Sequence, residues 1–190
     1  MMKKELRPAA WIYPQPAAVI ATYDNEGHAD AMLAVWTGIY DTDRIGMMLD
    51  HNHKTVDNLK ETGAFTYSMA TVETMAESDY FGSVSGHDKE NKIETAGFHA
   101  SKSAKVNAPV IEEYPLTFEC EVEKMIPEGE DFYVVGKIKG ILADESILTH
   151  GRPDPAKLHA LAFDGVNRTY LEVKDKAGMA WAEGRKFIKK

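Results

Sequence analysis

The chain has 190 residues, of which 44% are hydrophobic, and its formal net charge is −8. This length and composition predict one domain over residues 1–190 that can bury a full core, and the acidic balance argues against nucleic acid as a partner. The single cysteine, Cys120, excludes an internal disulfide, and because the sequence shows no signal peptide or membrane span, we expect a cytoplasmic protein without membrane contact.

The first third of the chain predicts three strands. An apolar segment over 17–23 predicts a buried strand, and the acidic turn 24–27 connects it to a returning strand over 28–36. A third strand is expected over 44–49, after the polar turn 41–43. The first two of these strands are therefore expected to form a β-hairpin.

A helix is predicted after the third strand. It begins near Thr55, carries Val56 and Leu59 at a one-turn spacing, and stops at Gly63. The segment 64–69 alternates apolar and polar residues, which predicts a half-buried strand.

The middle of the chain is polar. A short helix is predicted over 72–76, with Thr71 as its cap. Residues 79–109 then form a long connection, helical in part around 92–97, and so long a connection within one domain is usually functional.

The second half again predicts β-structure. The segment 116–123 has apolar residues at every second position, so its polar residues are expected to face water. A hairpin turn over 127–131 leads into a strand over 132–143, where Gly136 and Gly140 predict a bulge or bend.

Strand-like segments over 158–163 and 169–173 complete the elements. Many strands at hairpin spacing with few helices predict a mainly β protein, built as a closed antiparallel barrel.

The turn over 50–55 is the strongest candidate site. A strand ends there and a helix begins, so free backbone N–H groups, the Lys54 ammonium and the Thr55 hydroxyl can share an anion such as phosphate. An ordinary polar connection is the alternative. A nucleotide-triphosphate loop is rejected because it needs Gly before the Lys, where this chain has His53.

The segment 32–36 is apolar on both of its faces. Trp36 could fill the core of a buried strand. Alternatively, one face is a platform for a flat aromatic ligand, which the small Ala34 would let approach the backbone. The residues alone leave both readings open.

Other candidate groups form no convincing catalytic set. His51 and His53 could be a metal pair, but a site needs a third ligand, and His87 and His99 are distant in sequence, so we expect exposed loop residues and no metal. Cys120 lies in the apolar register of its strand and is expected to be a buried hydrophobe. The absence of a catalytic set favours chemistry carried by a bound cofactor.

The ordered succession of these motifs resembles the flavin reductase-like family, most closely its flavoredoxin branch. The similar segments cover nearly the whole chain: 16–22, 30–36, 53–65, 79–89, 96–98, 105–109, 116–120 and 178–187.

The resemblance implies an antiparallel split β-barrel of Greek-key type with a few short helices, binding FMN near a homodimer interface. The residues it assigns to the cofactor are Met32, Leu33, Ala34, Val35 and Trp36 along the isoalloxazine and ribityl side; Leu49, Asp50, His51, His53, Lys54 and Thr55 at the phosphate; and Ser85, Gly86 and Lys89 closing over the flavin.

Two redox versions stay open at this point. One is an enzyme that oxidises NAD(P)H and reduces flavin, and the other is an electron carrier with tightly held FMN and a redox protein partner. A third hypothesis is a non-redox barrel that binds another phosphorylated or haem-like ligand through His51, His53, His87 and His99. The basic tail 174–190 is expected to pack along the dimer.

Overall fold

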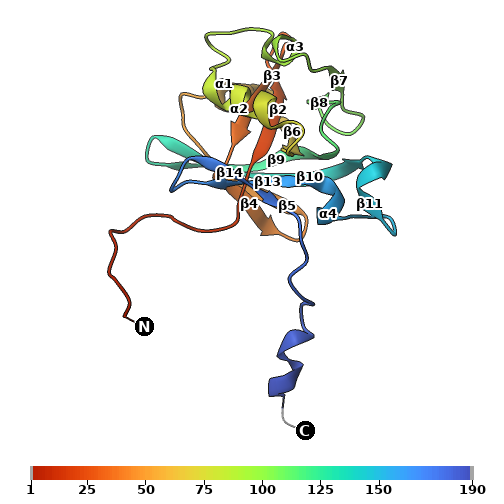
Figure 1. Cartoon of the computed structure of the whole chain (residues 1–190). Helices are drawn as coiled ribbons and strands as arrows, with labels where there is room; N and C mark the ends of the chain where they lie inside the picture. Colours follow the sequence, from red (N-terminus) through yellow and green to blue (C-terminus); the bar gives the residue numbers. More distant parts are fainter. Residues whose placement is uncertain (1, 189–190) are drawn as a thin grey trace.

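The computed structural model describes residues 2–188 (Figure 1). Seven strands form one antiparallel sheet in the order β3-β2-β6-β9-β10-β5-β4. In chain order they are β2 (Ala18–Tyr23), β3 (Ala29–Ala34), β4 (Thr37–Asp41), β5 (Arg44–Leu49), β6 (Ala64–Met69), β9 (Leu116–Glu128) and β10 (Asp131–Ala143). The mainly β, antiparallel class is confirmed. The prediction of a closed barrel is wrong, because β3 and β4, the two ends of this order, do not pair and leave the barrel split.

Smaller elements surround this sheet. The further strands are β1 (Gln15–Pro16), β7 (Ala100–Lys102), β8 (Pro109–Ile111), β11 (Leu148–Thr149), β12 (Arg152–Pro153), β13 (Ala160–Asp164) and β14 (Thr169–Val173). The helices are α1 (Lys54–Thr62), α2 (Met75–Ser83), α3 (Lys92–Thr95) and α4 (Pro155–Leu158), with short 3₁₀ turns η1 (Glu145–Ile147) and η2 (Glu183–Phe187). Among the described residues, no helix is long and apolar enough to cross a lipid bilayer.

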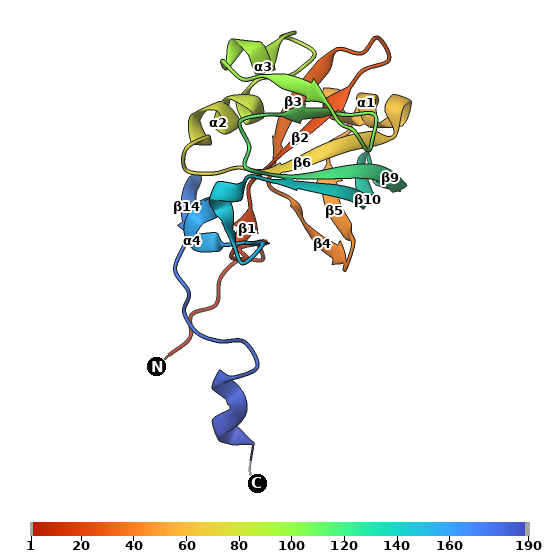
Figure 2. The same cartoon turned by 90° about the vertical axis from the view of Figure 1, so that its right-hand side faces the viewer.

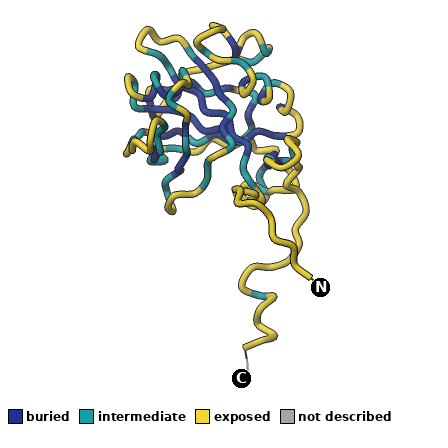
Figure 3. Tube along the Cα trace, turned by 90° about the vertical axis from the view of Figure 1, so that its left-hand side faces the viewer, coloured by how far each residue is buried: buried dark blue, intermediate teal, exposed yellow. Residues whose placement is uncertain are grey.

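The core follows from the apolar strands. Ile20, Met47 and Phe65 lie fully buried between β2, β5 and β6, and Val56 of α1 packs into the same cluster. A second cluster packs α2 and α3 on the other face of β2 and β3 (Figure 2). Burial is therefore concentrated in the barrel body, whereas the described residues of both terminal segments are mostly exposed (Figure 3).

Several local predictions are confirmed. Gly27 closes the β2–β3 hairpin with a positive φ of 87°, and Gly63 ends α1 at φ 66°, a left-handed conformation that suits glycine. The register of β9 and β10 shifts next to Gly136 and Gly140, which confirms the bulges. Cys120 is fully buried, and burial raises the pKa of its thiol to about 12.

Other local predictions need correction. The chain forms an additional strand, β4, before the turn at 41–43, and the helix predicted over 72–76 is α2, which begins at Met75. Residues 79–109 are helical in part, as predicted around 92–97, where α3 forms, but they also include the second half of α2, all of β7 and the start of β8, which were not predicted.

The predicted exposure also differs at three positions. β6 is buried on both faces, because Phe65 and Tyr67 pack into the main core cluster and Ala64 and Thr66 lie against the segment 106–109. The Thr66 hydroxyl donates to the carbonyl of Pro109, and the Ser68 hydroxyl bonds to that of Thr117. Glu119 of β9 is buried and accepts a hydrogen bond of 2.6 Å from Ser103. Trp36 is 63% exposed, so it is not a core residue.

Candidate functional site

The start of α1 is open to a ligand. His53 is its N-cap residue in an extended conformation and provides no side-chain cap. The N–H groups of Lys54 and Thr55 have no acceptor among residues 2–188, and neither does the Thr55 hydroxyl. A helix start with unused N–H groups attracts an anion.

A cleft lies beside this helix start. It consists of two adjoining hollows of about 230 Å³ each, which share Asp30, Lys54 and Gly86 in their walls. One hollow runs between β3, the start of α1 and the end of α2, and the other continues beneath the segment 86–91. Three chain regions that are distant in sequence therefore meet around one space.

Two of the cationic side chains in this cleft have no carboxylate partner among residues 2–188. Within the described residues, neither Lys54 nor Lys89 forms an ion pair or a side-chain hydrogen bond, although both line the same hollow. Asn58 of α1 also lines it, and although its Nδ2 donates to Thr22 at 2.9 Å, its buried Oδ1 has no partner. Hydrogen-bonding capacity at this site is left for a ligand.

A buried ion pair supports the cleft from below. The Lys92 ammonium, 2% exposed, lies 3.0 Å from the Asp30 carboxylate and donates to the carbonyls of Ala31 at 2.6 Å and Val84 at 3.0 Å. One cation therefore joins strand β3 to the segment that follows α2. A buried charge needs such partners to offset its lost hydration.

The segment over the cleft is held at further points. A Cβ on Gly86 would lie 2.7 Å from the Asp30 carboxylate, so only glycine fits there without displacement. The Ser85 hydroxyl accepts the His87 N–H at 3.1 Å, and the His87 ring lies 3.5 Å from the Asp57 carboxylate of α1. These contacts place residues 84–87 against both β3 and α1.

The structure brings together about half of the predicted site residues. The first hollow is lined by Met32, Leu33, His53, Lys54, Thr55, Ser85 and Gly86, and Lys89 lines the second. Ala34 lies nearby in β3 but is buried in the core cluster. β3 therefore lies beside the start of α1, and the role of these residues in binding a ligand stays a prediction.

Three predicted phosphate residues lie outside the cleft. Leu49 is buried in the core. Asp50 caps the turn by accepting the Asn52 N–H at 2.9 Å, and this hydrogen bond holds the pKa of Asp50 below its ordinary value. His51 faces Asp131, a residue 80 positions away in the sequence that is not among the predicted site residues. A direct ligand role for these three residues stays a prediction.

Val35 and Trp36 also lie away from the cleft. They line a separate groove of about 270 Å³ together with the N-terminal residues Ile12 and Pro14. Their assignment to the ring side of a flavin stays a prediction.

Three of the four histidines of the haem-like hypothesis have separate acidic partners. His51 faces Asp50 and Asp131, His87 faces Asp57, and His99 binds Glu113, which raises the pKa of His99. Among residues 2–188, no potential metal-ligand group contains two of these histidines. Their arrangement does not favour that hypothesis.

Asp30, Lys92 and Asn58 are site residues that sequence reasoning missed. Asp30 carried a usable signal, because a carboxylate within the apolar strand 29–34 requires a cation nearby. No comparable local pattern indicates Lys92 or Asn58.

Known proteins match this chain over most of its length. Residues 11–159 match the family model described as the flavin reductase like domain. Flavoredoxin of Desulfovibrio vulgaris (Miyazaki F) superposes with a TM-score of 0.91 at 30% identity, covering 96% of this chain and all of that one. For flavoredoxin from Methanosarcina acetivorans the TM-score is 0.90 at 25% identity, with 99% and 100% covered.

A third structure shares the fold, and one curated relative matches in part. A Shewanella frigidimarina protein with a split barrel domain has a TM-score of 0.78 at 18% identity, covering 88% of this chain and 86% of that one. An uncharacterised Archaeoglobus fulgidus protein is 31% identical over 110 residues, which is 58% of this chain and 61% of that protein, so the match spans about three fifths of this curated relative. The chain belongs to the flavin reductase-like family, in its flavoredoxin branch.

Proposed function

We propose that this chain binds FMN in the cleft beside α1 and passes electrons through it. The observation that carries the proposal is the pair of cations, Lys54 and Lys89, that line one hollow without carboxylate partners among the described residues. Membership in the flavin reductase-like family supports a flavin-binding redox protein.

The helix start supplies the phosphate site of this proposal. The N–H groups of Lys54 and Thr55, the Thr55 hydroxyl and the Lys54 ammonium would share the phosphate charge. Each charge-assisted hydrogen bond contributes about 1.5–3 kcal/mol. FMN differs from riboflavin only by this phosphate, so the site would select FMN.

The rest of the cleft suits the remainder of the cofactor. The free Oδ1 of Asn58 and the exposed ammonium of Lys89 can serve polar groups, whereas Met32 and Leu33 of β3 offer an apolar wall for a ring. Gly86 lets the covering segment lie close to Asp30, because any larger residue would place a Cβ against that carboxylate.

A bound flavin supplies hydride and single-electron chemistry itself. The chain therefore has to bind the flavin, orient it and limit its access to water. An NAD(P)H:flavin oxidoreductase and an electron carrier that exchanges electrons with a redox protein both fit this requirement.

The proposal includes a homodimer. Apolar side chains on both terminal segments are exposed in the single chain, and they suit burial against a second copy. The predicted flavin contacts of Val35 and Trp36 would then lie near the interface.

Titration of the purified protein with FMN and with riboflavin tests the proposal. We expect a shifted flavin absorbance spectrum and tighter binding of FMN. Stopped-flow mixing with NADH and with NADPH then separates the two versions, because rapid bleaching indicates the enzyme and no bleaching indicates the carrier. An unshifted FMN spectrum contradicts the proposal, and binding of another phosphorylated compound in its place would favour the non-redox barrel.

A further inference from the structure

Both chain ends leave the barrel body from one small sheet. β1, which begins the ordered body, pairs with β13, and β13 pairs with β14, the last strand before the tail. The N-terminal arm (residues 2–14) and the C-terminal arm (residues 174–188) then project to the same side of the body (Figures 1 and 2).

The C-terminal arm carries large apolar side chains that its own chain does not cover. Trp181 is 93% exposed and Phe187 78% exposed, and Met179 is also exposed. Residues 174–179 form neither helix nor strand, so this segment can span roughly 20 Å when extended. The arm therefore has both the reach and the surface to bind outside its own body.

An apolar groove lies at the root of the N-terminal arm. Its walls include Ile12, Pro14, Val35 and Trp36, and its volume is about 270 Å³. Trp36 is largely exposed there, although it is the largest side chain in the groove. A buried partner for these side chains would remove apolar surface from water.

Charge also favours contact between the arm and another copy. Residues 174–190 contain six Lys and Arg residues against two acidic residues, whereas the whole chain has a net charge of −8. The arm is thus basic and the remainder of the chain is strongly acidic. Opposite charges of this kind steer an arm toward the body of a second molecule.

We propose that two copies of this chain exchange their C-terminal arms, and that Trp181 and η2 of each copy dock in the groove beside Trp36 of the other. A two-fold axis makes such contacts reciprocal. Both terminal arms project to the same side of the body, and the groove includes residues at the root of the N-terminal arm. The proposal rests on the proposed homodimer and adds the segment that holds it together. It also places a partner residue next to Trp36, one of the predicted flavin contacts.

Cross-linking between two differently tagged variants tests this exchange. One variant carries Ile12→Cys and the other Gly184→Cys, which leaves Trp181 in place, and a short bis-maleimide is added to their equilibrated mixture. A Cβ added at position 184 meets no atom within 4 Å in its own chain. We expect a covalent dimer that contains both tags. The buried Cys120 does not react, and a mixture of Gly184→Cys with Val166→Cys, an exposed position on the β13–β14 turn, is the matched control.

Sedimentation of full-length variants supplies the second readout. Trp181→Ala should raise the dimer dissociation constant roughly tenfold or more, as expected for an aromatic anchor, and Val166→Ala should leave it unchanged. A stable dimer without the two-tag product overturns the arm exchange but not the homodimer, and a monomer overturns both. FMN titration of the same samples is independent, so failure of flavin binding is recognised separately.

Discussion

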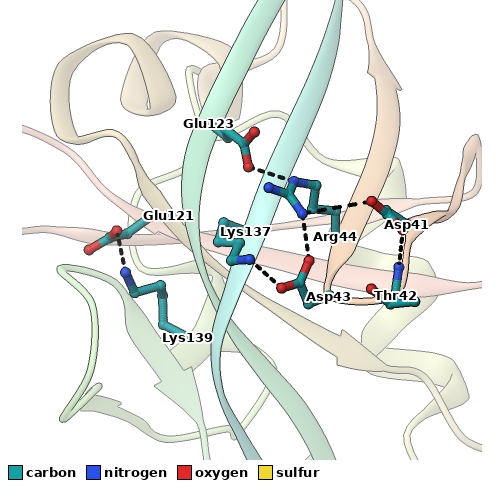
Figure 4. A network of polar contacts seen from close by, with 8 residues as sticks. All are labelled: Asp41, Thr42, Asp43, Arg44, Glu121, Glu123, Lys137 and Lys139. Carbon is teal, nitrogen blue, oxygen red and sulfur yellow. Dashed lines mark hydrogen bonds and ion pairs between the residues drawn. The ribbon is translucent and has the colours of Figure 1, made fainter.

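Cations are used in opposite ways in two regions of this molecule. On the outer face of the sheet, Arg44 lies 2.6 Å from both Glu123 and Asp43, Lys139 lies 3.1 Å from Glu121, and Lys137 pairs with Asp43 (Figure 4). In the cleft beside α1, Lys54 and Lys89 have no such partners in the described chain. Paired cations connect strands β5, β9 and β10, whereas unpaired cations beside a hollow are available to a ligand.

Lys92 combines features of both regions, because it is paired and also lies under the cleft. Replacing it with methionine would leave the Asp30 carboxylate buried without a cation and remove the link from Ala31 to Val84. We expect a loss of about 3–5 kcal/mol in the free energy of unfolding. Urea unfolding measures this loss, and the double variant Asp30→Asn, Lys92→Met should recover part of it. An equal loss in the double variant would contradict the role of the ion pair.

Removing an unpaired cation should affect ligand binding and leave stability nearly unchanged. Lys54→Ala should weaken FMN binding by about 1.5–3 kcal/mol and leave riboflavin binding unchanged, since only FMN carries the phosphate. Isothermal titration with both flavins measures the difference. Lys139→Ala, from the paired region, is the control and should bind both flavins normally. If both flavins weaken equally in Lys54→Ala, the phosphate lies elsewhere.

The covering segment offers a steric test of the cleft. Gly86→Ala places a methyl group 2.7 Å from the Asp30 carboxylate, which Lys92 holds in position, and such overpacking costs about 1–3 kcal/mol of stability. Gly38→Ala is the matched control, because no atom lies within 4 Å of its added Cβ. Unfolding curves that are the same for both variants would mean that residues 84–87 move away freely.

The smallest expected effect concerns acid stability of the paired region. The hydrogen bond from Lys137 holds the pKa of Asp43 below its ordinary value of 3.8. A lowered pKa in the folded state stabilises the protein above pH 3.8, and this contribution is lost as the pH falls further. Lys137→Met should therefore reduce the fall in melting temperature between pH 7 and pH 3.

The matched control for this titration comes from the cleft. Lys54→Met removes a cation that has no carboxylate partner, so it should retain the native pH dependence of the melting temperature. A native pH dependence in Lys137→Met as well would show that the Asp43 pair does not contribute.

Local sequence rules predict the elements on which the site is built. Gly63 marks the end of α1, and the apolar runs over 17–23 and 44–49 become β2 and β5, because these features act within one turn or one strand. β4 escaped prediction because Thr37–Asp41 is a partly exposed edge strand that includes a glycine. The burial of Glu119 depends on Ser103, which is 16 residues away and follows no periodic pattern.

In the candidate site, too, local features are predictable from the sequence and long-range contacts are not. Lys54 and Thr55 are predictable because a strand–helix turn orients N–H groups locally. Lys92 supports the cleft through a hydrogen bond to the carbonyl of Ala31, which lies 61 residues earlier in the sequence. Sequence periodicity gives no information about contacts between residues so far apart in the chain. The apolar residues before Trp36 favour a core position for it. Its exposure instead depends on where β3 ends and on how much of its ring the N-terminal arm covers.

A crystal structure of this protein grown with excess FMN tests the central claim most directly. We expect the flavin phosphate at the start of α1, within hydrogen-bond distance of the Thr55 N–H and the Lys54 ammonium. A phosphate bound at another place, such as the Asp50–His51 turn, or a cleft without flavin at saturating concentration, would contradict the account.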